Sequence, residues 1–207
     1  NKNEAGYIQQ DAVVGYEDTS LDANGLRIGE FYLRPRETKQ ECVIDPYAYD
    51  VQGQTTWMVS LITPIVVEQT FYGIAGADLS IAFIQALVDQ ENAAFYEGIG
   101  TIAVVSYHGI LAGISGKSDL VGKTIQDWRP EQKQQILANI QVGKATLDFS
   151  TDLVEVSVPL QIGQAPTPWG VIITIPKQTV LAATLELTQG VHVRARQDPV
   201  SYTHLRA

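Results

Sequence analysis

The sequence has few of the residues on which most enzyme and metal sites depend. Cysteine occurs once, at Cys42, so no disulfide can form within the chain and cysteine-based metal sites are excluded. Histidine occurs three times, and only His108 precedes the C-terminal stretch. The sequence contains no histidine pair with metal-ligand spacing, no phosphate-binding loop and no nucleophile–base motif. We therefore expect no catalytic residue, no metal ion and no cofactor.

Basic residues and long apolar runs are also scarce. The chain has 14 Lys and Arg against 23 Asp and Glu, a net charge of −9, which argues against a nucleic-acid surface. Its longest apolar stretches, such as Trp169–Ile175, fall far short of the roughly 18 residues of a membrane helix. What remains is a globular composition, 45% hydrophobic and 18% charged. Its 207 residues suffice for one large domain or two small ones.

A weak internal repeat favours two modules. Thr63–Val67 leads through Tyr72–Gly76 to Asp78, and about 95 residues later Val158–Ile162 leads through Trp169–Ile173 to Pro176. Each copy has a strand with a proline, a turn, an aromatic–glycine pair that opens a second strand, and then a helix. This similarity indicates two copies of one supersecondary unit.

The predicted elements give an α+β fold class, with two tandem PAS-like modules that each form an antiparallel sheet flanked by helices. Short, β-branched strands joined by few residues are typical of antiparallel pairing. Gly109 marks a turn between two strands. Helices are predicted after the cap Ser80, from Pro130 until Gly143, and from Pro176 onward through Leu187. The predicted strands are Trp57–Val67, Thr70–Asp78, Thr101–Tyr107, Leu153–Ile162 and Trp169–Ile175.

Aromatic and acidic side chains in the first half indicate a small-ligand site. Tyrosine combines an apolar ring with a polar tip, which suits the wall of a ligand cavity. Asp78 ends an apolar strand just before Ser80, so its carboxylate must find donors or a cation. It either completes the helix cap or also binds a ligand ammonium, while simple packing on the sheet is the alternative for the tyrosines. The candidates are Tyr32, Tyr47, Tyr49, Asp78 and, more weakly, Asp45.

Several motifs, in this order and spacing, resemble the double Cache sensor domains of chemotaxis receptors, sensor kinases and cyclic-nucleotide signalling enzymes. The resemblance covers residues 16–189. The motifs of the first half are Phe31–Arg36, Asp45–Tyr47, Ser60–Ile65 and Phe71–Ser80. The motifs of the second half are Gly109–Ala112, Leu120–Lys123, Asp127–Trp128, Pro168–Val171 and Ile175–Pro176.

The resemblance implies a membrane-distal, ligand-binding module over residues 1–90, without the long N-terminal helix of the family, and a membrane-proximal module over residues 91–189. It implies that Asp78 contacts a ligand ammonium, and we expect Tyr32, Tyr47 and Asp78 to enclose a hollow. In the amino-acid-sensing subset an arginine stands where Gly29 is found, and an acid where Tyr49 is found. An amine or another class of ligand therefore stays open beside an α-amino acid, and Arg34 or Arg36 could replace the arginine.

We expect a soluble, extracytoplasmic fragment of a membrane-anchored receptor that binds a small molecule and has neither a nucleic-acid partner nor enzymatic activity. Homodimerisation of the full receptor stays open. One alternative is an interaction module that docks a periplasmic binding protein, and the least favoured is a hydrolase. Residues 190–207 break the acidic pattern, and the run from Val200 to Ala207 resembles a translated sequencing adapter. We expect this tail to be non-native.

Overall fold

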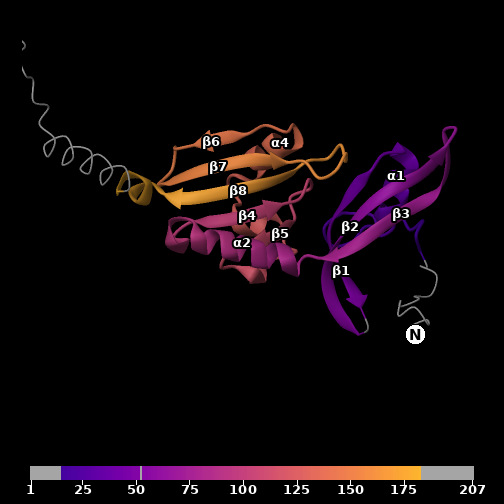
Figure 1. Cartoon of the computed structure of the whole chain (residues 1–207), viewed down its shortest axis with the longest axis horizontal. Helices are drawn as coiled ribbons and strands as arrows, with labels where there is room; N and C mark the ends of the chain where they lie inside the picture. Colours follow the sequence, from indigo (N-terminus) through magenta and orange to yellow (C-terminus); the bar gives the residue numbers. More distant parts are fainter. Residues whose placement is uncertain (1–14, 52, 183–207) are drawn as a thin grey trace, which may run out of the picture.

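Two antiparallel sheets follow one another along the chain, as the internal repeat predicts (Figure 1). The first has the order β1-β2-β3 and the second the order β5-β4-β8-β7-β6. The computed structural model describes residues 15–51 and 53–182, so the tail predicted over residues 190–207 lies outside the described part. The α+β fold class predicted from the sequence is confirmed.

The first sheet forms around a long central strand, β2, that has a covered face on each side. Ile62 packs with Phe31 of the helix α1, whereas Val59, three positions earlier and on the opposite face, belongs to the core shared with the second sheet. This alternation follows from the two-residue period of a strand. The elements of this part are α1 (Glu30–Thr38), β1 (Cys42–Val51), β2 (Gln54–Val67) and β3 (Thr70–Ser80).

Two bulges set the register of the first sheet. One extra residue lies in β1 between Ile44 and Tyr47, and another lies in β3 opposite the step from Ile65 to Val66. The β2–β3 hairpin closes with Glu68 and Gln69, whose φ angles of 48° and 66° both lie in the left-handed region. A two-residue turn with this backbone matches the twist of the flanking strands.

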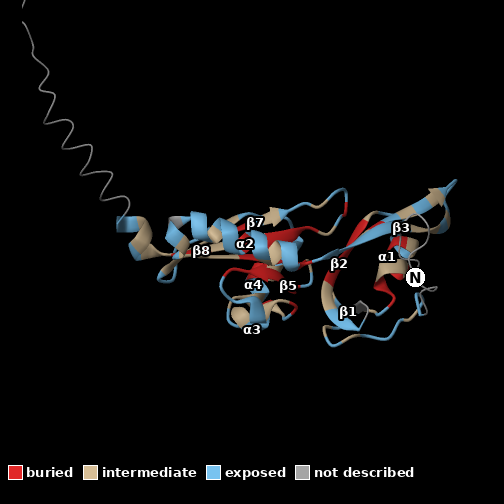
Figure 2. Cartoon of the chain, turned by 60° about the horizontal axis from the view of Figure 1, so that its bottom comes forward, coloured by how far each residue is buried: buried red, intermediate tan, exposed pale blue. Residues whose placement is uncertain are grey.

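The second sheet is covered on both faces. Val104 points toward the cluster that includes Val88 of α2, while Ala103 and Val105 point toward Ile136 of α4. Figure 2 shows buried residues around β5 and α4 and along β2. The strands are β4 (Thr101–Val105), β5 (Leu111–Ile114), β6 (Thr146–Asp148), β7 (Leu153–Leu160) and β8 (Trp169–Pro176). The helices are α2 (Ala82–Ala94), α3 (Ile125–Trp128) and α4 (Lys133–Gln141), with short 3-10 turns η1 (Tyr96–Gly98) and η2 (Ser118–Leu120).

The predicted strands correspond to β2, β3, β4, β7 and β8, although β4 ends at Val105 rather than at Tyr107. The turn at Gly109 is confirmed by a φ of 90°. Two of the three predicted helices correspond to α2 and α4. Of the third, residues 177–182 are helical and the rest lies outside the described part. The elements α1, α3, β1 and β6 were not predicted from the sequence, and β5 was predicted only as a strand after the Gly109 turn, without bounds.

The two sheets share one hydrophobic cluster. Val43 and Val59 of the first sheet are in the same cluster as Val104 and Trp169 of the second. Helix α2 spans the predicted module boundary at residue 90 and packs against β4 and β5. Within the described residues, no helix is long and apolar enough to cross a membrane.

Candidate ligand site

Three polar side chains form a chain of hydrogen bonds on the face of the first sheet that α1 covers. The Ser60 hydroxyl donates to Asp78 Oδ1 at 2.6 Å. Because that proton is used, the Tyr47 hydroxyl donates to Ser60 Oγ, at 2.8 Å. Tyr47 also lies 3.5 Å from Asp78 Oδ1. Ser60 is buried, Tyr47 half-buried and Asp78 exposed, so the chain runs from the sheet interior to its surface.

The two bulges bring these residues together. Ser60 pairs with Asp78 across β2 and β3, and this register depends on the extra residue in β3. In β1, the three-residue step from Ile44 to Tyr47 is opposite a two-residue step in β2. Because of this extra residue, Ile44 and Tyr47 both point toward α1. Pro46 lies within this bulge, where a residue without a backbone N–H disrupts no ladder hydrogen bond.

Asp78 keeps one oxygen free. The Ser60 bond and the longer Tyr47 contact both reach Oδ1, and Oδ2 has no hydrogen-bond partner among the residues that the structure describes. Burial and the neighbouring Asp78 carboxylate raise the pKa of Tyr47, although its bond with Ser60 opposes this shift. The tyrosine therefore remains a neutral donor. The N-cap of α2 is Ile81, without a side-chain cap hydrogen bond, so neither Ser80 nor Asp78 occupies the cap position predicted from the sequence. The Ser80 Oγ accepts from the Ala82 N–H at 3.3 Å from one position before the cap.

Tyr49 lies near this group, and Tyr32 does not. The ring of Tyr49 is 43% exposed and meets Tyr47 edge-to-face, with 6.4 Å between centroids. Tyr32 instead packs against Phe71 at 5.5 Å. Phe71 and Asp78 are seven positions apart on β3, or roughly 20 Å along a strand. The hollow predicted between Tyr32, Tyr47 and Asp78 is therefore not formed by these three residues.

Asp45 points to the opposite face, toward the second sheet. Its buried carboxylate accepts from the His108 backbone N–H at 3.2 Å and lies 2.8 Å from His108 Nδ1. Burial alone would raise the pKa of Asp45, but the bonds and charge of His108, with a bond from Ser106, hold it below its ordinary value. This candidate joins the two sheets, and its part in ligand binding stays a prediction.

The two arginines considered as carboxylate clamps are both engaged in other ion pairs. Arg34 Nε donates to Glu30 Oε1 at 2.7 Å. Arg36 pairs with Glu17, and its guanidinium lies 5.5 Å from the centroid of Tyr32. Glu30 is itself buried and is shared with Arg27 at 2.5 Å. A ligand carboxylate would have to compete with these glutamates, except at Arg34 Nη1, which is buried and has no hydrogen-bond partner in the described part of the chain.

Ser60 is the site residue that the sequence analysis missed. A single hydroxyl between Met58 and Ile62, on one face of a predicted strand, is the signal that could have indicated it. Its pairing with Asp78 could not be read from the turn, because the bulge shifts the register by one residue.

A catalytic or metal-binding arrangement is not found in the described part of the chain. No three His, Cys, Asp or Glu side chains there lie close enough to hold a metal ion. His108 and Asp45 form a base–carboxylate pair, but a hydrolase would need a nucleophile at the second ring nitrogen. Within residues 15–51 and 53–182, no serine, threonine or cysteine is bonded to that nitrogen.

A curated chemoreceptor is a relative in sequence. The chain is 31% identical over 184 residues to the methyl-accepting chemotaxis protein TlpQ of Pseudomonas aeruginosa. This match covers 88% of the chain and 26% of TlpQ, so the chain spans about a quarter of that relative. No protein-family model matches the chain.

Solved sensor domains share the architecture. The extracellular domain assigned to the histidine kinase mmHK1S-Z3 matches with a TM-score of 0.65 and 20% identity, covering 84% of this chain and 59% of that one. The ligand-binding domain of the amino-acid chemoreceptor PctC of Pseudomonas aeruginosa, solved with GABA, matches with a TM-score of 0.52 and 18% identity, covering 70% and 60%. With its two antiparallel, helix-flanked modules and its sequence similarity to a chemoreceptor, the chain has the fold of these extracellular sensor domains, in agreement with the resemblance to Cache domains in its sequence.

Proposed function

We propose that the chain is the extracytoplasmic part of a transmembrane receptor and that its first module binds a small amine. The observation that carries this proposal is Asp78, whose Oδ2 is unbonded within the described residues while the Ser60 hydroxyl, itself bonded to Tyr47, holds Oδ1. A carboxylate oriented in this way can accept a hydrogen bond from an ammonium group. The rings of Tyr47 and Tyr49 can contact the same cation through their faces.

The ion pairs of Arg34 and Arg36 favour an amine over an α-amino acid as the ligand. Recognition of an α-carboxylate is strongest when a free guanidinium binds it in a bidentate manner. Arg34 and Arg36 are paired with Glu30 and Glu17, and glycine stands at position 29. The complex of PctC with GABA supports a ligand with an amino group for a protein of this architecture.

Signalling requires that the ligand favour one state of the receptor. A ligand that bound two receptor states equally well would shift nothing, however tight its binding. We infer that the ligand acts through the arrangement of the two modules, since the sheet that carries the site also shares a core with the second sheet. The proposed role is sensing without catalysis.

Calorimetric titration with propylamine and 1,4-diaminobutane, with GABA and propionate for comparison, tests the proposal. We expect an amine to bind and Asp78→Asn to raise its Kd about tenfold or more, because a hydrogen bond to a charged group is lost. Tyr47→Phe should weaken binding less, since it removes only the donor to Ser60 Oγ and leaves the Ser60–Asp78 bond in place. Asp119→Asn, an exposed acid in η2, is the matched control. Unchanged amine affinity in Asp78→Asn would refute this site.

One observation favours the alternative of docking a periplasmic binding protein. Ile65, Val67 and Tyr72, on the β2–β3 hairpin, are 46%, 55% and 69% exposed. Exposed apolar residues gathered on one element are typical of protein contacts. Under this alternative, Tyr72→Ser abolishes binding of the partner protein, and no free amine binds. Amine binding by Tyr72→Ser as by the unchanged chain would instead favour direct sensing.

A further inference from the structure

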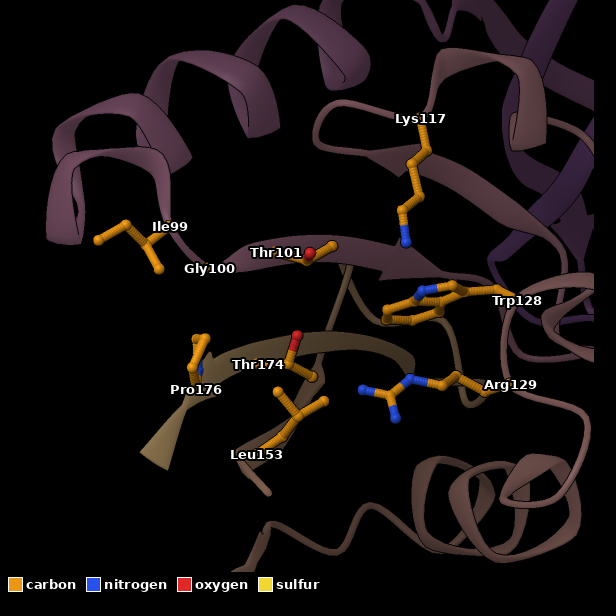
Figure 3. A pocket seen from close by; sticks show the side chains of 9 residues that line it. All are labelled: Ile99, Gly100, Thr101, Lys117, Trp128, Arg129, Leu153, Thr174 and Pro176. Carbon is orange, nitrogen blue, oxygen red and sulfur yellow. The ribbon is translucent and has the colours of Figure 1, made fainter. Parts of the chain in front are cut away.

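The second module contains a cavity of about 330 Å³ at the end of its sheet that lies beside Pro176. This volume is at the small end of the range of ligand pockets, which is about 300–1,000 Å³. Its walls combine apolar groups with two cationic side chains and two hydroxyls (Figure 3). The lining residues are Ile99, Gly100, Thr101, Lys117, Trp128, Arg129, Leu153, Thr174 and Pro176.

A polar row on an otherwise apolar sheet face forms the floor. Thr101 pairs with Thr174, and Thr174 pairs with Glu155, so the three residues lie in one row across β4, β8 and β7. The row two positions further along the same face contains Ala103 and Ile172, which are part of the core under α3 and α4. Polar side chains usually satisfy their hydrogen bonds when they approach a core. Here the two threonine hydroxyls have no side-chain hydrogen bond within the described residues and face the cavity.

The cations come from two loops that their own interactions hold in place. Lys117 follows Gly116, whose N–H donates to Asp89 Oδ1 at 2.9 Å. Arg129 ends α3, which begins with a capping box between Thr124 and Asp127. In Figure 3 the Trp128 ring lies between the Lys117 ammonium and the Arg129 guanidinium. The α3 backbone therefore fixes Trp128 and Arg129 relative to the cavity.

The charges of the site leave a net positive charge in an acidic protein. Arg129 Nη2 lies 3.2 Å from Glu155 Oε2, and the guanidinium stacks on Trp128 at 5.1 Å. This arrangement fixes the guanidinium plane through one of its nitrogens and the ring. Lys117 has no ion pair within residues 15–51 and 53–182. Two cations against one carboxylate suit a monoanion, in a chain with a net charge of −9.

We propose that this cavity is a second binding site, in the second module, for a small organic carboxylate with a short apolar part. The carboxylate binds at the row formed by Thr101 and Thr174 and accepts from a threonine hydroxyl, with Lys117 and Arg129 as counter-charges on either side of the Trp128 ring. The apolar part contacts Trp128, Leu153 and Pro176, which supply the non-polar wall. This site is separate from Asp78. Through it the receptor would respond to an anion as well as to the amine proposed above.

Nuclear magnetic resonance of the three tryptophan indole N–H groups provides a direct test, with Trp128→Phe identifying the Trp128 signal. Propionate and benzoate are titrated at constant ionic strength. We expect a saturable shift of the Trp128 signal that is retained in Asp78→Asn. Lys117→Gln should raise the Kd about tenfold, whereas Lys144→Gln, an exposed lysine outside the cavity, should leave it unchanged.

Arg129 requires a compensated variant, because its removal alone would leave Glu155 without a partner. Arg129→Gln combined with Glu155→Gln keeps the pair neutral and should abolish the propionate shift. Absence of a saturable shift in the unchanged chain would overturn the proposal, as would an equal Kd in Lys117→Gln. Sulfate binding as tight as that of propionate would overturn the assignment of an organic ligand.

Discussion

At the scale of single residues, Cys42 shows how burial determines reactivity. Its side chain is 3% exposed, between α1 and the first sheet, and burial raises the pKa of its thiol to about 11, with the Arg34 charge opposing this and the Glu30 charge adding to it. A shift of two units from 9.0 lowers the thiolate fraction about 100-fold. The thiolate is the nucleophile in reactions of cysteine, so the folded chain should carry an inert thiol.

We expect Ellman's reagent at pH 8 to modify native Cys42 at least about 100-fold more slowly than the urea-unfolded chain. Gln90→Cys, which adds an exposed thiol on α2, is the control, and its new thiol should react quickly in the same sample. Two equally fast thiols in that variant would show that Cys42 is accessible.

At the scale of elements, the β2–β3 hairpin carries a turn of unfavourable composition. Glu68 and Gln69 both adopt positive φ angles, which asparagine and glycine tolerate far better. The turn is held in part by Lys39, whose Nζ donates to the Gln69 carbonyl at 2.5 Å. Replacing the two residues with Asn-Gly leaves that carbonyl in place.

The double variant Glu68→Asn with Gln69→Gly should increase the free energy of unfolding by about 1 kcal/mol, because the strained backbone is relieved. Urea denaturation measures the change. Glu68→Gln alters the charge but not the backbone preference, so it should have almost no effect. A double variant no more stable than that control would mean that the turn stores no strain.

The elements differ in how far the sequence could predict them. Apolar runs bounded by turn residues predicted β2, β3, β4, β7 and β8, since pattern and turn residues agreed there. Helix α1 was missed because Pro35 lies inside it and only a few of its residues face the sheet.

The candidate site depended on two bulges that the sequence did not indicate. One pairs Ser60 with Asp78, and the other leaves Asp45 on the opposite face from Tyr47. A one-residue shift of register changes the face of every side chain, and nothing local in the sequence marks it.

At the scale of the whole molecule, the contacts between the modules combine one apolar core with a hydrogen-bonded link through the buried Asp45 carboxylate. Trp57 packs so closely on Gly122 that a Cβ there would lie 2.2 Å from the ring. Glu41 accepts from the Gln164 N–H at 3.0 Å. Asp45 and His108 lie between β1 and the β4–β5 turn. The link should therefore stabilise the pair of modules together.

Asp45→Asn should lower the free energy of unfolding by about 1–3 kcal/mol at pH 7, since a buried hydrogen-bonded charge is lost. The pKa of Asp45 is depressed in the folded state, so its contribution is complete above about pH 4 and is lost as the pH falls further. The difference between the variant and the unchanged chain should therefore shrink from pH 5 to pH 2 in urea titrations. Asp152→Asn, an exposed acid, should show no such trend. A gap that stays constant with pH would contradict this role.

Pro46 has a mechanical consequence. It is the only residue between Asp45, which is anchored on His108, and Tyr47, which belongs to the Ser60–Asp78 chain of hydrogen bonds. The pyrrolidine ring locks one of its two backbone torsions, so the peptide here is stiffer than elsewhere in the strand. Pro46 therefore limits how far the backbones of Tyr47 and Asp45 can move independently of each other, on the two faces of β1.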